Sequence, residues 1–75
     1  HAQYVHLKEG SNPWEVAQHH LKHQGVHNPS NLAIEREDAK IGQAYMKAHK
    51  LGKYTWGAWA KIAQHLPSGT KLRVR

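Results

Sequence analysis

Histidine is the residue type in this sequence that most readily suggests chemistry, because eight of the 75 residues are histidine. His19 and His23 are four positions apart, so a helix would place both imidazoles on one face, as zinc ligands can be. The chain has no cysteine, and no glutamate lies between these two histidines in the order that catalytic zinc sites use. We therefore predict solvated surface histidines, with no metal site and no cofactor.

Catalysis is not predicted from the acidic residues. It would need a nucleophile with a base, or paired carboxylates in a cleft. The five acidic residues are Glu9, Glu15, Glu35, Glu37 and Asp38. Three of them crowd one predicted helix start, and Glu15 suits a helix cap. We expect a non-catalytic chain, with any activity belonging to another part of a longer protein.

Positive charge is the strongest compositional signal. Eleven Lys and Arg residues stand against five Asp and Glu, which gives a formal charge of +6 and favours polyanionic partners. Lys47, Lys50 and Lys53 are either a solvated helix end or a docking surface for an anionic polymer. No stretch approaches the ~18 apolar residues that a membrane span needs.

Three tryptophans could act as sugar platforms or as core residues. Trp14, Trp56 and Trp59 recur at helical spacing with alanine and isoleucine, which is more typical of a core. Trp14 follows a helix cap and is predicted to be structural. Trp56 and Trp59 lie beside the smaller Ala60 and Ala63, so one of the two tryptophans is expected to be partly exposed.

The strands and helices that hold these residues can be predicted from the spacing of apolar residues and from helix-capping residues. Alternating or β-branched patterns predict strands at residues 4–8 and 71–75. Asn12, Pro13 and Glu15 form a predicted capping box that starts a helix ending at Gly25. Further helices are expected over residues 32–50 and 55–64. The apolar stripe of the middle helix is predicted to be Ile34, Ile41, Ala44, Tyr45, Ala48 and Leu51.

This order predicts a small α+β fold of the type β-α-α-α-β. The two strands come from the chain ends, so we expect them to form a two-stranded antiparallel sheet packed on the helices. The chain is short enough to be a single domain spanning residues 1–75.

The two ends together resemble a known family. Residues 5–17, VHLKEGSNPWEVA, resemble the opening of a LysM (lysin motif) module, which is a short strand followed by Gly-Asp-Thr/Asn-x-Trp, any residue, an aliphatic residue and alanine. Residues 66–74, LPSGTKLRV, resemble its closing pattern, aliphatic-x-x-Gly-x-x-Leu-x-aliphatic. The chain departs from the family where Ser11 replaces the usual aspartate and where residues 24–54 form an insertion, an extended helical middle segment.

The resemblance implies a binding module for N-acetylglucosamine-containing glycan, such as peptidoglycan or a chitin-like polymer. Such a module anchors a secreted or cell-wall protein, which implies an extracytoplasmic location. The chain begins with His1 and not Met, which favours a chain that is part of, or processed from, a longer protein. Carried over by position, the shallow glycan groove would use Gly10, Ser11, Asn12, Pro13, His65, Leu66, Pro67 and Ser68.

Two other functions remain open at this level. LysM-like modules also serve as protein-docking pieces in secretion and phage-tail assemblies. Alternatively, residues 35–38, Gly52, residues 59–63 and residues 66–67 resemble a Myb or SANT repeat, which would bind DNA through a third, recognition helix. That helix would have to fall within residues 70–75, where the pattern alternates as in a strand, so nucleic acid is the less favoured partner.

Overall fold

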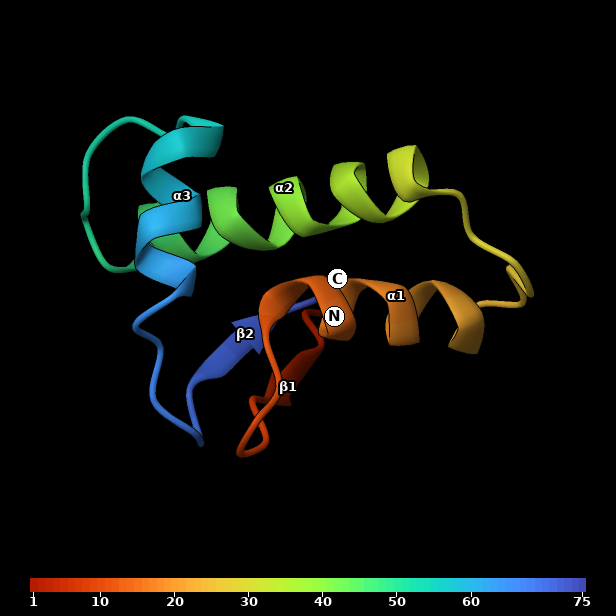
Figure 1. Cartoon of the computed structure of the whole chain (residues 1–75). Coiled ribbons are helices and arrows are strands. Elements are labelled where there is room, and N and C mark those ends of the chain that lie inside the picture. Colours follow the sequence, from red (N-terminus) through yellow and green to blue (C-terminus); the bar gives the residue numbers. More distant parts are fainter.

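The two chain ends form the sheet, as predicted. In the computed structural model, which describes all 75 residues, strand β1 (Tyr4–His6) pairs antiparallel with strand β2 (Lys71–Arg73). Tyr4 lies opposite Arg73, and His6 lies opposite Lys71. The pairing continues past both strands, because Leu7 N–H donates to Thr70 O at 2.8 Å and Gln3 N–H donates to Arg75 O at 3.0 Å. The two termini therefore lie side by side (Figure 1).

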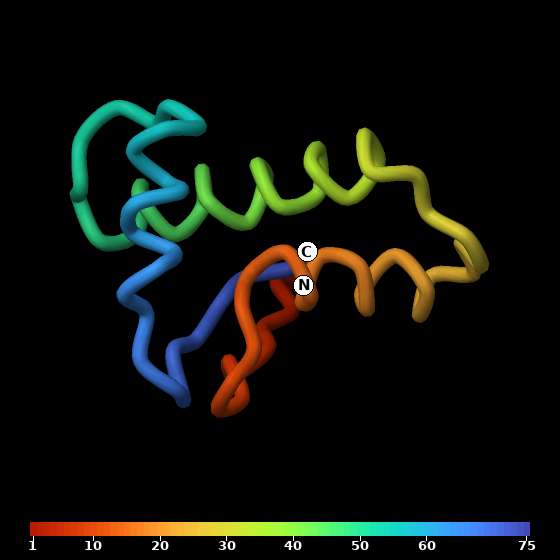
Figure 2. Tube along the Cα trace, viewed as in Figure 1, coloured from red at the N-terminus to blue at the C-terminus, as the bar shows by residue number.

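Three helices connect the strands and complete the predicted β-α-α-α-β order. They are α1 (Pro13–His23), α2 (Asn31–Ala48) and α3 (Trp56–Ala63). Helices α1 and α2 run side by side in opposite directions, and α3 crosses the C-terminal end of α2 (Figures 1 and 2). None of the three helices is long and apolar enough to span a lipid bilayer.

Each helix begins at a polar cap. The side-chain oxygens of Asn12, Ser30 and Thr55 accept hydrogen bonds from backbone N–H groups three residues later, at 2.9–3.1 Å. These bonds satisfy N–H groups that would otherwise have no partner in the first helical turn. The predicted capping box at Asn12 is half formed, because Glu15 makes no return bond to the backbone of Asn12.

The core lies between the helices and one face of the sheet. Leu72 and Val74 point into it from the C-terminal segment, as the alternating pattern predicts. Trp59 is only 1% exposed and is the largest fully buried side chain, whereas Trp56 is 43% exposed. Trp14 is half-buried against the edge of this core. The tryptophan at the centre of the structure is therefore Trp59, and Trp14 has a supporting position.

Helices α2 and α3 cross at a close approach in the core. A Cβ built on Gly42 would lie 2.6 Å from two atoms of the Trp59 ring, so only glycine lets the two helices approach this closely. The Trp59 ring Nε1 donates a 2.8 Å hydrogen bond to Asp38 Oδ1. Asp38, at 6% exposure, thus lies one turn before Gly42 on the interior face of α2.

This arrangement corrects the predicted apolar stripe of α2. Asp38, Gly42 and Met46 lie on the buried face together with Ile34 and Ile41. Leu51, which we expected on the stripe, is 47% exposed because the helix ends at Ala48.

Asp38 makes the stability of the domain depend on pH. Burial raises the pKa of Asp38, and the hydrogen bond from Trp59 offsets part of that rise. Because the folded-state pKa is above the unfolded one, the unfolded state loses this proton first as pH rises. The contribution of Asp38 to stability is therefore greatest in acid and falls as pH rises from the ordinary aspartate pKa through the raised value.

We expect Asp38→Asn to remove this dependence, because asparagine stays neutral and keeps a carbonyl oxygen for Trp59. The check is urea denaturation of the wild type and the variant from acid to neutral pH. The stability of Asp38→Asn relative to the wild type should increase with pH, and the histidines cancel in this difference because both proteins carry them. A difference that is constant with pH would contradict the prediction.

Candidate functional site

The two loops predicted to form the glycan site lie side by side. The β1–α1 loop (residues 7–12) and the α3–β2 loop (residues 64–70) meet at one end of the sheet (Figure 1). Gly69 N–H donates to Leu7 O at 2.6 Å, next to the bond from Leu7 N–H to Thr70 O. The strand pairing therefore holds the two loops together, as the resemblance implies.

Each loop is also fixed internally by a tight turn. Ser11 N–H donates to Lys8 O at 3.0 Å, and the Thr70 hydroxyl donates to Pro67 O at 2.6 Å. Gly10 and Gly69 have φ angles of +80° and +86°, in the left-handed region that favours glycine. The loops thus present backbone groups in a defined arrangement.

Most of the predicted glycan residues are accessible. Gly10, Asn12, His65, Pro67 and Ser68 are exposed, and Ser11 and Leu66 are half-buried. The extended middle segment does not cover them, because α2 packs against α1, α3 and β2 (Figure 2).

Pro13 is the exception among the eight residues. Its side chain is fully buried at the first turn of α1, so it belongs to the core and cannot form an apolar wall for a sugar ring. The side-chain oxygen of Asn12 already accepts a hydrogen bond at the start of α1, so it is less available to a ligand. Backbone groups remain free: the N–H groups of Gly10 and Ser68 donate to no atom of the chain.

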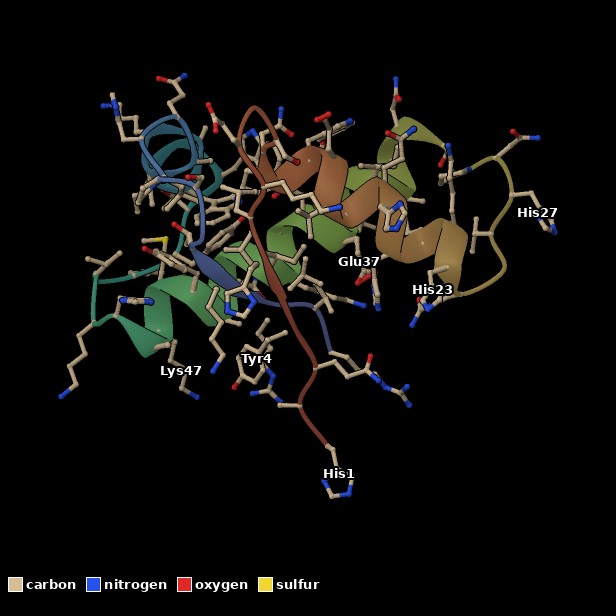
Figure 3. The ribbon with its side chains drawn as sticks, turned by 90° about the horizontal axis from the view of Figure 1, so that it is seen from below. His1, Tyr4, His23, His27, Glu37 and Lys47 are labelled. Carbon is tan, nitrogen blue, oxygen red and sulfur yellow. The ribbon has the colours of Figure 1, made fainter.

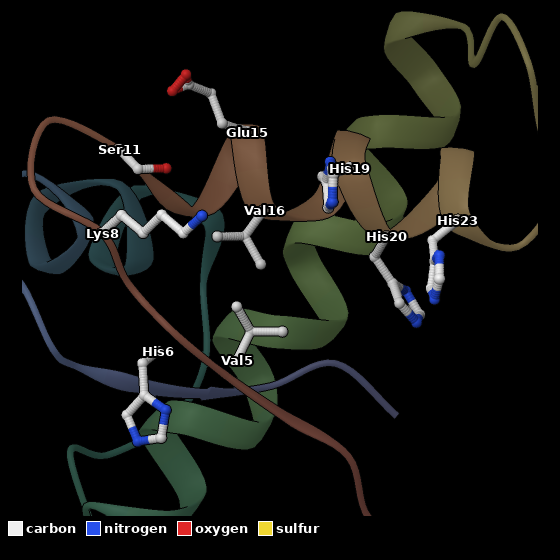
Figure 4. A pocket seen from close by; sticks show the side chains of 9 residues that line it. All are labelled: Val5, His6, Lys8, Ser11, Glu15, Val16, His19, His20 and His23. Carbon is white, nitrogen blue, oxygen red and sulfur yellow. The ribbon is translucent and has the colours of Figure 1, made fainter.

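A first surface hollow of about 320 Å³ lies between β1 and α1 (Figure 4). Four of the residues that line it are histidines: His6, His19, His20 and His23. His20 is nearly buried, and its Nδ1 lies 4.0 Å from Glu37 Oε2 of α2. Ser11 also lines this hollow, but no residue of the α3–β2 loop does.

The histidines do not assemble a metal centre. No three side chains of His, Asp or Glu come close enough together to hold an ion. The spacing of His19 and His23 on one helix can be recognised in the sequence, but no local pattern indicates that His6 of β1 lines the same hollow.

A second hollow, of about 940 Å³, lies between the C-terminal half of α2 and the sheet. We call it the basic groove. Its polar and aromatic lining consists of Tyr4, Tyr45, Lys47, His49, Thr70, Lys71 and Arg73. Pro67 also lines it, and is the member of the predicted glycan set that reaches this side of the molecule.

The basic groove changes the grouping of the lysines. Of Lys47, Lys50 and Lys53, only Lys47 lines the groove. Lys50 follows the end of α2 with a φ of +54°, and Lys53 lies in the following turn. The three lysines that are close in sequence therefore do not form one surface. Lys47 lies with Lys71 and Arg73 of β2 in the groove.

The two groups with shifted pKa values lie away from the two end loops that were predicted to bind glycan. Burial raises the pKa of Tyr54, and the nearby carboxylates of Asp38 and Glu35 raise it further. The pKa of Asp38 is the other one raised by burial. Both groups lie at the contact of α2 with the segment leading into α3.

Comparison with known proteins adds no family to these observations. No protein-family model, no curated protein and no solved structure matches this chain.

Proposed function

We propose that this chain is a non-catalytic, LysM-like binding module for N-acetylglucosamine-containing glycan. The observation that carries the proposal is the meeting of the β1–α1 and α3–β2 loops at one exposed end of the sheet, where Gly69 N–H bonds to Leu7 O. These are the two segments whose sequences resemble the LysM opening and closing patterns. The proposal places the protein in the cell wall, the periplasm or outside the cell.

The chemistry of the loops suits an acetamido sugar. An acetamido group offers one N–H donor and one carbonyl acceptor, so backbone groups that are free can bind it without a charged side chain. The free N–H groups of Gly10 and Ser68 supply donors on the two loops. Leu66 and Pro67 supply apolar surface for the sugar ring, and Pro13 contributes by holding the first loop at the start of α1.

DNA binding of the Myb type has less support. The segment that would have to form the recognition helix contains β2, paired with β1 over three residue pairs. A module without that helix has nothing to place in the major groove.

Sedimentation with insoluble glycan tests the proposal. The protein is mixed with peptidoglycan or chitin at increasing salt, and the bound fraction is measured. Binding through neutral acetamido groups should persist in high salt, whereas adhesion through the +6 charge should fade.

A matched pair of variants locates the site. Ser68→Ile places a branched side chain on the α3–β2 loop and should weaken binding about tenfold, equivalent to about 1.4 kcal/mol. Gln24→Ile makes a similar change at the exposed C-terminal end of α1, away from the loops, and should leave binding unchanged. Equal binding by both variants, or loss of wild-type binding at high salt, would refute the proposal.

A further inference from the structure

We propose that the basic groove is a second binding site, and that its ligand is a linear phosphate polymer without aromatic bases, such as a polyol phosphate. This site shares Pro67 and Thr70 with the α3–β2 loop, but its charged residues lie on α2 and β2, and it does not depend on the proposed glycan function. It rests on the charges, the spacing and the aromatic contacts of the groove.

The charge of the groove is of one sign. Lys47 comes from α2, and Lys71 and Arg73 come from β2, while no acidic side chain lines the groove. Glu35 and Glu37 lie in the N-terminal half of α2, and Asp38 is buried against Trp59. Figure 3 shows Lys47 and Tyr4 on one side of the molecule, with Glu37 farther along α2 beside α1. An anion in the groove thus meets three cations and no acidic side chain, although Arg73 Nε already donates a 3.0 Å hydrogen bond to Arg75 O.

The spacing of the cations favours a chain over a small ion. Lys71 and Arg73 are two residues apart on β2, with Leu72 between them pointing into the core. Alternate residues of a strand point to the same side about 6.6 Å apart. Lys47 faces them from the other wall of a hollow of about 940 Å³, which is larger than one phosphate needs. Successive charges of an extended polymer can contact all three.

The aromatic rings argue against single-stranded nucleic acid. Proteins that bind it offer free aromatic faces on which bases stack. In the groove one face of each ring is already in contact: Lys71 Nζ lies 4.2 Å from the centroid of the Tyr4 ring, and the rings of Tyr45 and His49 stack with centroids 4.1 Å apart. The Tyr4 contact also helps to hold the Lys71 ammonium in place. The groove therefore offers one cation held against a ring, and its aromatic faces are less open to stacking than free rings would be.

The experiment measures binding of a fluorescent glycerol-phosphate oligomer, with oligothymidylate and a neutral chitin oligomer of similar length as comparators. The glycerol-phosphate oligomer should bind more tightly than either comparator. With three cations engaged, the logarithm of the binding constant should fall with the logarithm of salt concentration with a slope of about −2, if the polymer behaves as a single strand does. Tighter binding of oligothymidylate would replace the proposal with a nucleic-acid site.

Two double variants of equal charge separate the groove from general attraction. Lys47→Gln with Lys71→Gln removes two groove cations, and should weaken binding at least about tenfold, since two of three charge contacts are lost. Lys50→Gln with Lys53→Gln removes two cations that do not line the groove and should change binding less than about twofold. Equal weakening in both would show that net charge and not the groove binds the polymer.

Two further measurements guard against a folding artefact. Both double variants should remain folded, because all four lysines are exposed, and only the variant without Lys71 should melt slightly lower through the lost contact with Tyr4. In the wild type, backbone amide shifts on adding the oligomer should cluster at residues 44–49 and 70–73. Shifts confined to residues 10–13 and 65–69 would place the polymer on the end loops and overturn the proposal.

Discussion

Replacing Trp59 with alanine is expected to remove a large part of the free energy of unfolding of the domain. Trp59 is 1% exposed, and truncating a buried tryptophan costs about 3–5 kcal/mol. A chain of 75 residues has a total stability of about 4–11 kcal/mol, on the usual scale per residue. The variant also leaves the buried Asp38 carboxyl without its hydrogen-bond donor, which adds to the loss.

Urea denaturation followed by circular dichroism measures this effect, and Trp56→Ala is the control. Trp56 is 43% exposed in the same helix, three residues before Trp59. Its replacement should cost about 1 kcal/mol or less, as for most exposed sites. Similar losses in the two variants would mean that Trp59 is not the centre of the core.

Gly42→Ala is expected to destabilise the domain by about 1–3 kcal/mol, the usual range for overpacking a core. The added Cβ would lie 2.6 Å from two atoms of the Trp59 ring, so α2 and α3 would have to move apart. In an unobstructed helix the same substitution stabilises by up to about 1 kcal/mol, because alanine is the better helix former.

Gly57→Ala provides a control of opposite sign. Gly57 is also helical, and a Cβ there would meet nothing within 4 Å. The denaturation midpoint should therefore rise for Gly57→Ala and fall for Gly42→Ala. A rise for both variants would contradict the close approach of α2 and α3.

The topology could be predicted because its signals are local. The alternating pattern around Leu72 and Val74 indicates a half-buried strand, and Asn12 followed by Pro13 indicates a helix start. Two strands at opposite ends of a small chain have few partners other than each other. The adjacency of the two end loops then follows from the pairing, which is why the accessible loop residues could be named from the sequence.

The interior of α2 could not be predicted in the same way. Asp38 and Gly42 look like solvent-facing residues in the sequence, and they are buried because Trp59, 21 residues after Asp38, supplies a hydrogen bond and a flat ring. Trp14 was predicted to be structural from its place after the helix cap, and it lies half-buried against the edge of the core.

The basic groove also depends on tertiary packing. Lys47 has two lysine neighbours in the sequence, Lys50 and Lys53, yet it is grouped with Lys71 and Arg73 because β2 packs against α2. The burial of Pro13 also depends on tertiary packing. Its place in the first turn of the helix was predicted, but its burial was not.

The most direct test of the glycan-binding proposal is an NMR titration of the isotope-labelled chain with chitin oligomers. Binding at the end loops predicts amide shifts confined to residues 10–13 and 65–69, with the core amides around Trp59 unchanged. The absence of shifts at millimolar ligand, or shifts clustered only around Lys47, Lys71 and Arg73, would contradict glycan binding at the end loops.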